Sequence, residues 1–206
     1  SLYKEMGYDD CISLKESDKD LIKHLNTLVY QKLCSLYNHS LKKSLDEGIE
    51  IPGFNEIMVD ILHDFGIPAS LTGYQYLKRA IEMAFLNIDT VVGGVTKVIY
   101  PTIAQMYNTT SPRVERSMRH AIETGWCRAK IETMEKIFSY SYSNEKGKPT
   151  NGEFIANISD YLIIHFRKER KEYLSAHPDN VENVNHIINI SNAVSIGNNK
   201  EKEPVI

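Results

Sequence analysis

The chain has 206 residues, a formal net charge of -3, 25% charged residues and 42% apolar residues. This is ordinary globular composition, and the length suits one domain with an appendage or two small domains. No run of about 18 apolar residues could span a membrane, and the first residues lack the apolar core of a secretory signal. The three cysteines, Cys11, Cys34 and Cys127, include no CxxC pair, which predicts a cytoplasmic protein without a disulfide framework or zinc cluster.

The first two stretches, residues 1–26 and 27–53, are expected to lie outside the main domain. A turn and short strand are predicted at residues 7–14, followed by a helix start at residues 18–25 with acidic residues in its first turn. Spacings of three and four then predict an amphipathic helix that ends near Gly48; its apolar residues are Leu28, Val29, Leu33, Leu36, Tyr37, Leu41 and Leu45. Two interpretations of this helix stay open, packing against the domain and dimerisation.

The third stretch, residues 54–176, is predicted to be an all-helical domain, with Pro52 and Gly53 marking its start. Two capping-box patterns, Thr72 with Gln75 and Thr150 with Glu153, each predict the start of a helix. The expected helices cover about residues 54–65, 72–87, a segment ending near 107, 111–128, 131–138 and 150–174. The last stretch, residues 177–206, is rich in Asn and is expected to be disordered, although Ile187, Ile188, Ile190 and Val194 could form a weak docking helix.

Residues 101–128 have the pattern of a helix-turn-helix. Such a unit needs a small residue where its helices touch, a turn residue that tolerates left-handed geometry, and an apolar residue that locks the second helix. Ala104, Asn108 and Val114 supply these in order, and Asn is one of the few residues other than Gly that accepts a positive φ at low cost.

The second helix of this unit has one apolar and one basic side. At about 100° per residue, the apolar side comprises Val114, Met118, Ala121, Ile122, Gly125 and Ala129, and the polar side comprises Arg113, Arg116, Arg119, His120 and Glu123. Arginines spaced by three could read guanine edges in a major groove, and Glu115 could accept from cytosine or hold an arginine. The other interpretation is an ordinary solvated helix face.

The segment from Thr109 to Glu123 closely resembles the recognition helix of the sporulation stage-zero A family of transcription factors, response regulators of endospore-forming bacteria. The resemblance extends over most of residues 54–166, with landmarks at residues 61–69, 73–77, 96–101 and 148–156. It implies a six-helix effector domain that binds double-stranded promoter boxes as tandem dimers, regulates transcription and contacts RNA polymerase.

The resemblance also implies roles for individual residues. Base contacts are expected from Arg113, Glu115, Arg116 and Arg119, and phosphate contacts from Thr110, Ser111, His120, Lys146 and Lys148. Neither a cofactor, a metal nor a catalytic residue is expected, because the histidines form no ligand cluster and no nucleotide-binding or nucleophile motif is present.

Residues 1–26 resemble the end of a receiver domain. Lys15 fits the lysine that follows the last receiver strand, but Glu16 stands where that family has proline. The phosphoacceptor aspartate belongs to earlier strands, so the sequence is expected to be a part of a longer receiver-bearing protein or a truncated paralogue. A truncated paralogue acting mainly through protein–protein contacts, by mixed dimers or by inhibiting a full-length regulator, is therefore the alternative function.

Overall fold

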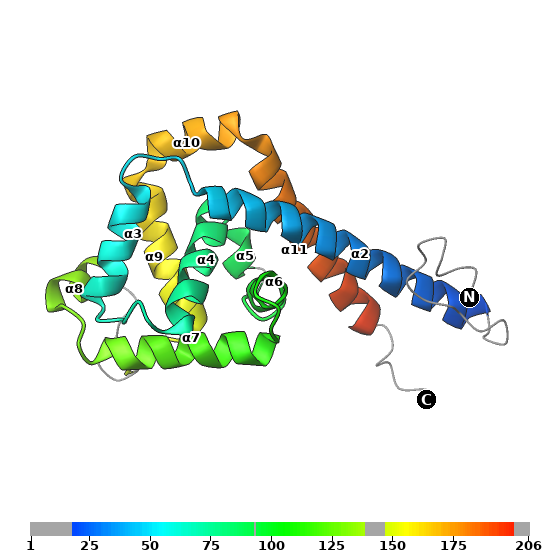
Figure 1. Cartoon of the computed structure of the whole chain (residues 1–206), viewed down its shortest axis with the longest axis horizontal. Helices are drawn as coiled ribbons and strands as arrows, with labels where there is room; N and C mark the ends of the chain where they lie inside the picture. Colours follow the sequence, from blue (N-terminus) through cyan, green and yellow to red (C-terminus); the bar gives the residue numbers. More distant parts are fainter. Residues whose placement is uncertain (1–17, 93, 139–146, 200–206) are drawn as a thin grey trace. The chain divides into compact units, whose positions relative to one another are not determined.

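The structure is a computed structural model that describes residues 18–92, 94–138 and 147–199. The described residues form helices and no strand, which confirms the all-α class (Figure 1). The strand expected near residues 10–14 lies outside them. The helices are α2 (Asp18–Glu47), α3 (Phe54–Asp64), α4 (Thr72–Leu86), α5 (Asp89–Val92), α6 (Ile99–Met106), α7 (Ser111–Trp126), α8 (Ile131–Phe138), α9 (Asn151–His165), α10 (Arg167–Ala176) and α11 (Pro178–Asn199).

The chain divides into two compact units, Ser1–Leu36 and Tyr37–Ile206. Helix α2 passes residues 26 and 27 without a break, although a division was expected there. No glycine or proline occurs between residues 18 and 47, so nothing in the local sequence stops the helix. The apolar residues predicted on one stripe differ in burial: Leu41 and Leu45 belong to the core, whereas Val29 and Leu36 are exposed.

Helix α4 is the centre of the second unit. Ala80, Ala84 and Gly73 are buried on it, and such small residues allow neighbouring helices to approach closely. Helices α7 and α9 both pack against α4, and α7 crosses near the beginning of α4 (Figure 1). The central helix therefore sets the position of α7.

The single helix expected over residues 150–174 is instead two helices, α9 and α10, which meet at Phe166. The buried Phe166 ring packs 5.8 Å from the Phe54 ring, measured between centroids. The turn brings Arg170 to the end of α4, where its Nε donates to the Phe85 carbonyl at 2.6 Å and its Nη2 to the Leu86 carbonyl at 3.1 Å. A cation at this position satisfies carbonyls that the helix leaves free.

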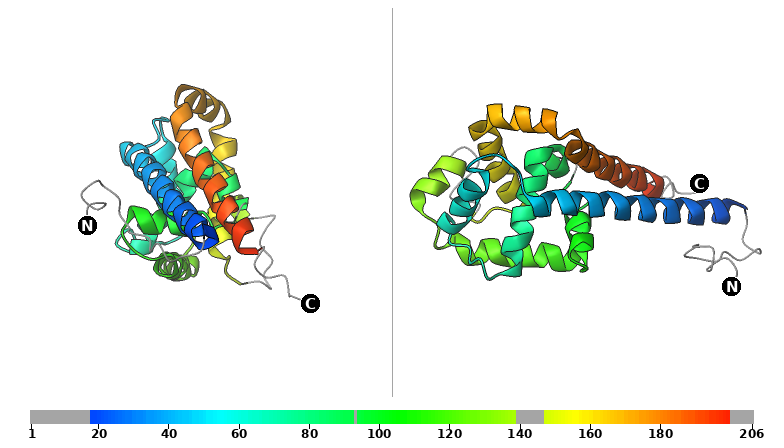
Figure 2. Two further views of the ribbon diagram at one scale, coloured as in Figure 1. Left: turned by 90° about the vertical axis from the view of Figure 1, so that its right-hand side faces the viewer. Right: turned by 45° about the horizontal axis from the view of Figure 1, so that its top comes forward.

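The expectation of disorder across residues 177–206 is wrong for residues 178–199, which form α11. Ile187 and Ile188 join the core, as the docking-helix alternative anticipated. Helix α11 lies beside the last part of α2, where Asn183 Nδ2 donates to Ser40 Oγ at 3.0 Å (Figure 2). Burial of the isoleucines offsets the low helix propensity of the asparagines.

One of the two predicted capping boxes is present. Thr150 accepts from the Glu153 backbone, and the Glu153 side chain accepts from the Thr150 backbone. The box predicted at Thr72 and Gln75 is wrong, because the N-cap of α4 is Leu71. Leu71 is placed by a preceding turn in which its N–H donates to the Pro68 carbonyl, so Thr72 already lies within the helix.

Candidate nucleic-acid interface

A tight turn joins α6 to α7, as the helix-turn-helix pattern predicted. Asn108 is in the left-handed region with φ 49°. The Thr109 N–H donates to the Ala104 carbonyl at 2.8 Å, and the Asn108 N–H donates to the Gln105 carbonyl at 3.3 Å. This pair of bonds is a Schellman motif, which ends α6 and turns the chain sharply into the next helix.

The beginning of α7 presents two hydroxyl side chains at the surface. Thr110 is the N-cap with an extended backbone, but its side chain makes no capping hydrogen bond. Ser111 and Pro112 are the first two residues of the helix, and both side chains reach the surface. Pro112 has no N–H, and the Arg113 N–H already donates to the Thr110 carbonyl at 2.9 Å. The positive end of the helix dipole at this terminus favours an anion.

Within α7, the buried and exposed sides are as predicted. The buried residues are Val114, Met118, Ala121, Ile122 and Gly125, and the exposed ones include Arg113, Arg116, Arg119 and His120. The helix ends at Trp126 rather than at Arg128, so Ala129 lies beyond it. One regular helix therefore projects its basic side chains away from the core.

Ion pairs neutralise some of the cations on or beside this face, but not all of them. Arg119 pairs with Glu115 four residues earlier. Lys148 pairs with Glu123 at 2.6 Å, and its hydrogen bond lowers the pKa of that carboxyl. Among the described residues, the side chains of Arg113 and Arg116 make no ion pair or hydrogen bond, so both remain available to a ligand.

Lys146, the other predicted loop contact, lies outside the described residues.

Sequence reasoning missed the residues that hold α7 in place. A Cβ built on Gly125 would stand 2.5 Å from the Phe65 carbonyl oxygen, so α7 touches the segment after α3 directly. Asn151 is buried and donates to both α6 and α7. Asn151 lies inside a recognisable capping box, between Thr150 and Glu153, but nothing in its local sequence indicated those partners.

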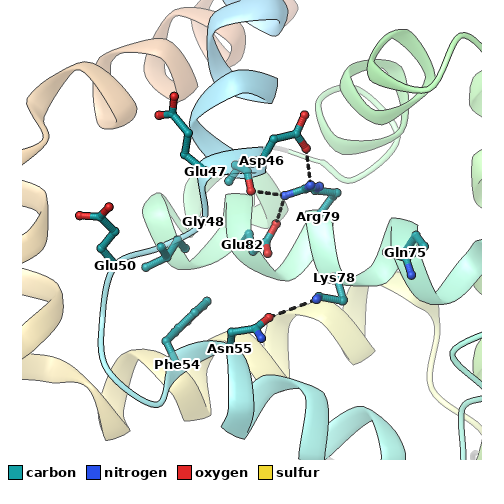
Figure 3. A pocket seen from close by; sticks show the side chains of 12 residues that line it. Asp46, Glu47, Gly48, Glu50, Phe54, Asn55, Gln75, Lys78, Arg79 and Glu82 are labelled. Carbon is teal, nitrogen blue, oxygen red and sulfur yellow. Dashed lines mark hydrogen bonds and ion pairs between the residues drawn. The ribbon is translucent and has the colours of Figure 1, made fainter.

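Arg79 connects the end of α2 to the turn after α6, and Figure 3 shows its contacts at the end of α2. Its guanidinium donates to the Leu45 carbonyl and pairs with Asp46 and Glu82, and its Nε donates to Tyr107 Oη at 3.4 Å. Leu45, Asp46, Arg79 and Glu82 border a pocket of about 450 Å³ that none of the predicted DNA-contacting residues lines. The pocket is therefore separate from the candidate interface.

Two further findings concern the described residues as a whole. None of their helices combines the length and apolarity needed to cross a bilayer. No three of their histidine, cysteine or acidic side chains gather in a way that could hold a metal ion.

A protein-family model described as "Sporulation initiation factor Spo0A C terminal" matches residues 58–162, a little over half of the chain. The match includes α4, α6, α7 and nearly all of α9. Helices α2, α10 and α11 lie outside it.

Proposed function

The chain belongs to the Spo0A C-terminal family, a family of DNA-binding effector domains of transcription factors rather than of catalysts, and on this basis we propose that it binds specific promoter sequences. In this proposal α7 lies in the major groove of double-stranded DNA. The observation that supports it best is the pair of exposed guanidinium groups, Arg113 and Arg116, which have no ion-pair or hydrogen-bond partner among the described residues and lie on the exposed side of a helix-turn-helix. A guanidinium fork fits the O6 and N7 atoms of guanine.

The remaining predicted residues take supporting roles in this proposal. Arg119 reads a base while Glu115, its ion-pair partner, fixes the orientation of the guanidinium or accepts from a cytosine amine. Contacts to phosphates come from Thr110 and Ser111 at the helix start, from His120, and from the loop residues Lys146 and Lys148. Phosphate contacts set the position of the helix, and base contacts select the sequence.

The proposal extends to partners. Two copies occupy adjacent half-sites as a dimer, since a single 16-residue helix reads only a few base pairs. The DNA-bound protein then contacts RNA polymerase to regulate transcription in the cytoplasm.

The proposal is tested by comparing the affinity of the chain for a promoter box of the family with its affinity for a scrambled duplex. Fluorescence anisotropy over a series of salt concentrations is the measurement. Arg116→Ala should cost about 1–3 kcal/mol on the box and relax preference at one base pair. The same change at Arg167, an exposed arginine on α10, is the matched control. Equal binding of wild type to box and scrambled duplex would refute sequence-specific recognition.

A second candidate function is regulation through protein–protein contacts. Leu25, Val29 and Leu36 on α2 are 45%, 56% and 58% exposed, a feature typical of helices that pair with another chain. In this function the chain forms mixed dimers with a full-length relative. A gel shift distinguishes the two candidates, because binding of the box only in the presence of the relative favours the second.

A further inference from the structure

The segment before α9 and the first residue of α9 are each attached to α7. Lys148 pairs with Glu123, and three residues later Asn151 Nδ2 donates to the backbone carbonyl of Glu115 at 3.0 Å. The capping box of Thr150 and Glu153 fixes the backbone between these attachments. These contacts therefore fix α7 to the start of α9 along the side that lies next to the basic face of α7.

The Asn151 amide joins three helices. Besides Glu115 on α7, it donates to Tyr100 Oη on α6 at 2.9 Å, while Asn151 itself begins α9. Asn151 is 6% exposed and Tyr100 is 8% exposed, so water competes weakly for these bonds. A buried amide that donates to two acceptors fixes their relative position, because an unsatisfied buried group is costly.

The acceptor on α7 belongs to the turn that carries base-contacting candidates. In a regular helix the Glu115 carbonyl accepts from the Arg119 N–H, and the bond from Asn151 uses its second lone pair. The Glu115 side chain also pairs with Arg119. Loss of the Asn151 bond would therefore let this turn of α7 tilt or shift relative to α6 and α9.

We infer that Asn151 is a positioning residue for sequence selection, which sets the angle at which α7 presents Arg116 and Arg119 to base edges. Asn151 itself touches no DNA in this assignment. The inference rests on the proposed function. A positioning role differs from that of a phosphate-contacting residue, because loss of a phosphate contact would weaken binding to every duplex alike.

The test compares Asn151→Ala and the shape-preserving Asn151→Asp with wild type, using the full chain. The measured quantity is the ratio of affinities for a family promoter box and for boxes with single base-pair changes. Both variants should lower this ratio by about three- to tenfold, the effect of one net hydrogen bond. In Asn151→Ala, which adds no charge, the salt dependence of binding should stay unchanged, since no phosphate contact is lost.

Two controls separate positioning from general stability. Tyr100→Phe removes one acceptor of the Asn151 amide but keeps the bond to the Glu115 carbonyl. The ratio of affinities for the family box and the changed boxes should therefore stay as in wild type. Ile158→Val makes a small cavity in the hydrophobic core beside α9, away from the Asn151 bonds, and should also leave the affinity ratio unchanged. An unchanged ratio in both Asn151 variants, or an equal fall in the controls, would overturn the inference.

Hydrogen exchange gives a readout that needs no DNA. In Asn151→Ala, backbone amides at residues 115–119 should exchange faster than in Ile158→Val. If wild-type protein shows no sequence preference, the proposed function fails, while this measurement still decides whether Asn151 holds α7. Unchanged exchange at those amides would overturn the positioning role.

Discussion

Gly73 on α4 faces the backbone of Ser117 on α7 so closely that a Cβ built on the glycine would stand 2.0 Å from the Ser117 carbonyl oxygen. The same Cβ would lie 2.8 Å from the Ala121 side chain. Real Cβ atoms do not approach a backbone oxygen this closely, so any larger residue would push α7 away from the core.

Gly73→Ala should consequently destabilise the fold and disturb α7. We expect a loss of about 1–3 kcal/mol in the free energy of unfolding, as for other overpacked sites. Urea denaturation is the measurement. Gly152→Ala is the control, because its Cβ would meet only the Val95 Cγ2 atom at 3.3 Å and alanine favours a helix. Equal stability of wild type and Gly73→Ala would show that the two helices can separate freely.

Glu123→Gln should raise affinity for all duplexes. The substitution removes a negative charge beside the basic face and releases Lys148 from its ion pair. A freed lysine that reaches a phosphate should steepen the dependence of log K on log salt by about one. Glu123→Gln combined with Lys148→Ala should lose this gain. A Glu123→Gln variant that changes preference at a single base pair, with no general gain, would contradict the phosphate role of Lys148.

Arg170→Met should destabilise the protein by about 1–3 kcal/mol, because the carbonyls of Phe85 and Leu86 lose their donors while the methionine retains the packing volume. Thermal unfolding measures the effect. Lys171→Met, at the exposed neighbouring position, should leave the melting temperature nearly unchanged. A similar shift in both variants would rule out the capping role.

Glu82 gives the stability of the second unit a specific pH dependence. Burial raises the pKa of its carboxyl above the ordinary value of 4.5, although Arg79 and Lys78 act in the opposite direction and Asp46 adds to the rise. A raised pKa in the folded state means that the protonated Glu82 carboxyl stabilises the fold. This stabilisation is fully present below the ordinary pKa of the group and is lost as pH rises through its pKa in the folded protein.

Glu82→Gln cannot ionise, so the stability of wild type relative to this variant should fall as pH rises above the ordinary carboxyl value of 4.5. Chemical denaturation at each pH measures the difference. Glu56→Gln, at an exposed position on α3, should not reproduce this trend. A relative stability of wild type that rises with pH would mean that Arg79 outweighs burial.

Ile187→Ala tests the tail helix. Ile187 is 3% exposed, and its truncation should cost about 2 kcal/mol or more in the free energy of unfolding. The same substitution at Ile164, which is 58% exposed, should have little effect. Equal unfolding midpoints for the two variants would mean that α11 does not pack on the domain.

The amino-acid sequence alone determined the local features of the candidate interface. Residue spacing identified the buried side of α7 from Val114 to Gly125 and its basic side, because helical periodicity depends only on neighbours along the chain. The left-handed turn at Asn108 and the capping box at Thr150 were predictable for the same reason. The Thr72 capping box failed because the turn from Pro68 to Leu71 competes for the helix start.

Tertiary structure alone decided which distant groups meet. Asn151 contacts Glu115, Arg170 caps α4, and the isoleucines of α11 join the core, although each pair is far apart in sequence. Asparagine at a helix start and arginine on a charged helix are common, so neither residue type identifies its partner in advance. The path of the chain brings these partners together, and burial makes their hydrogen bonds and packing consequential.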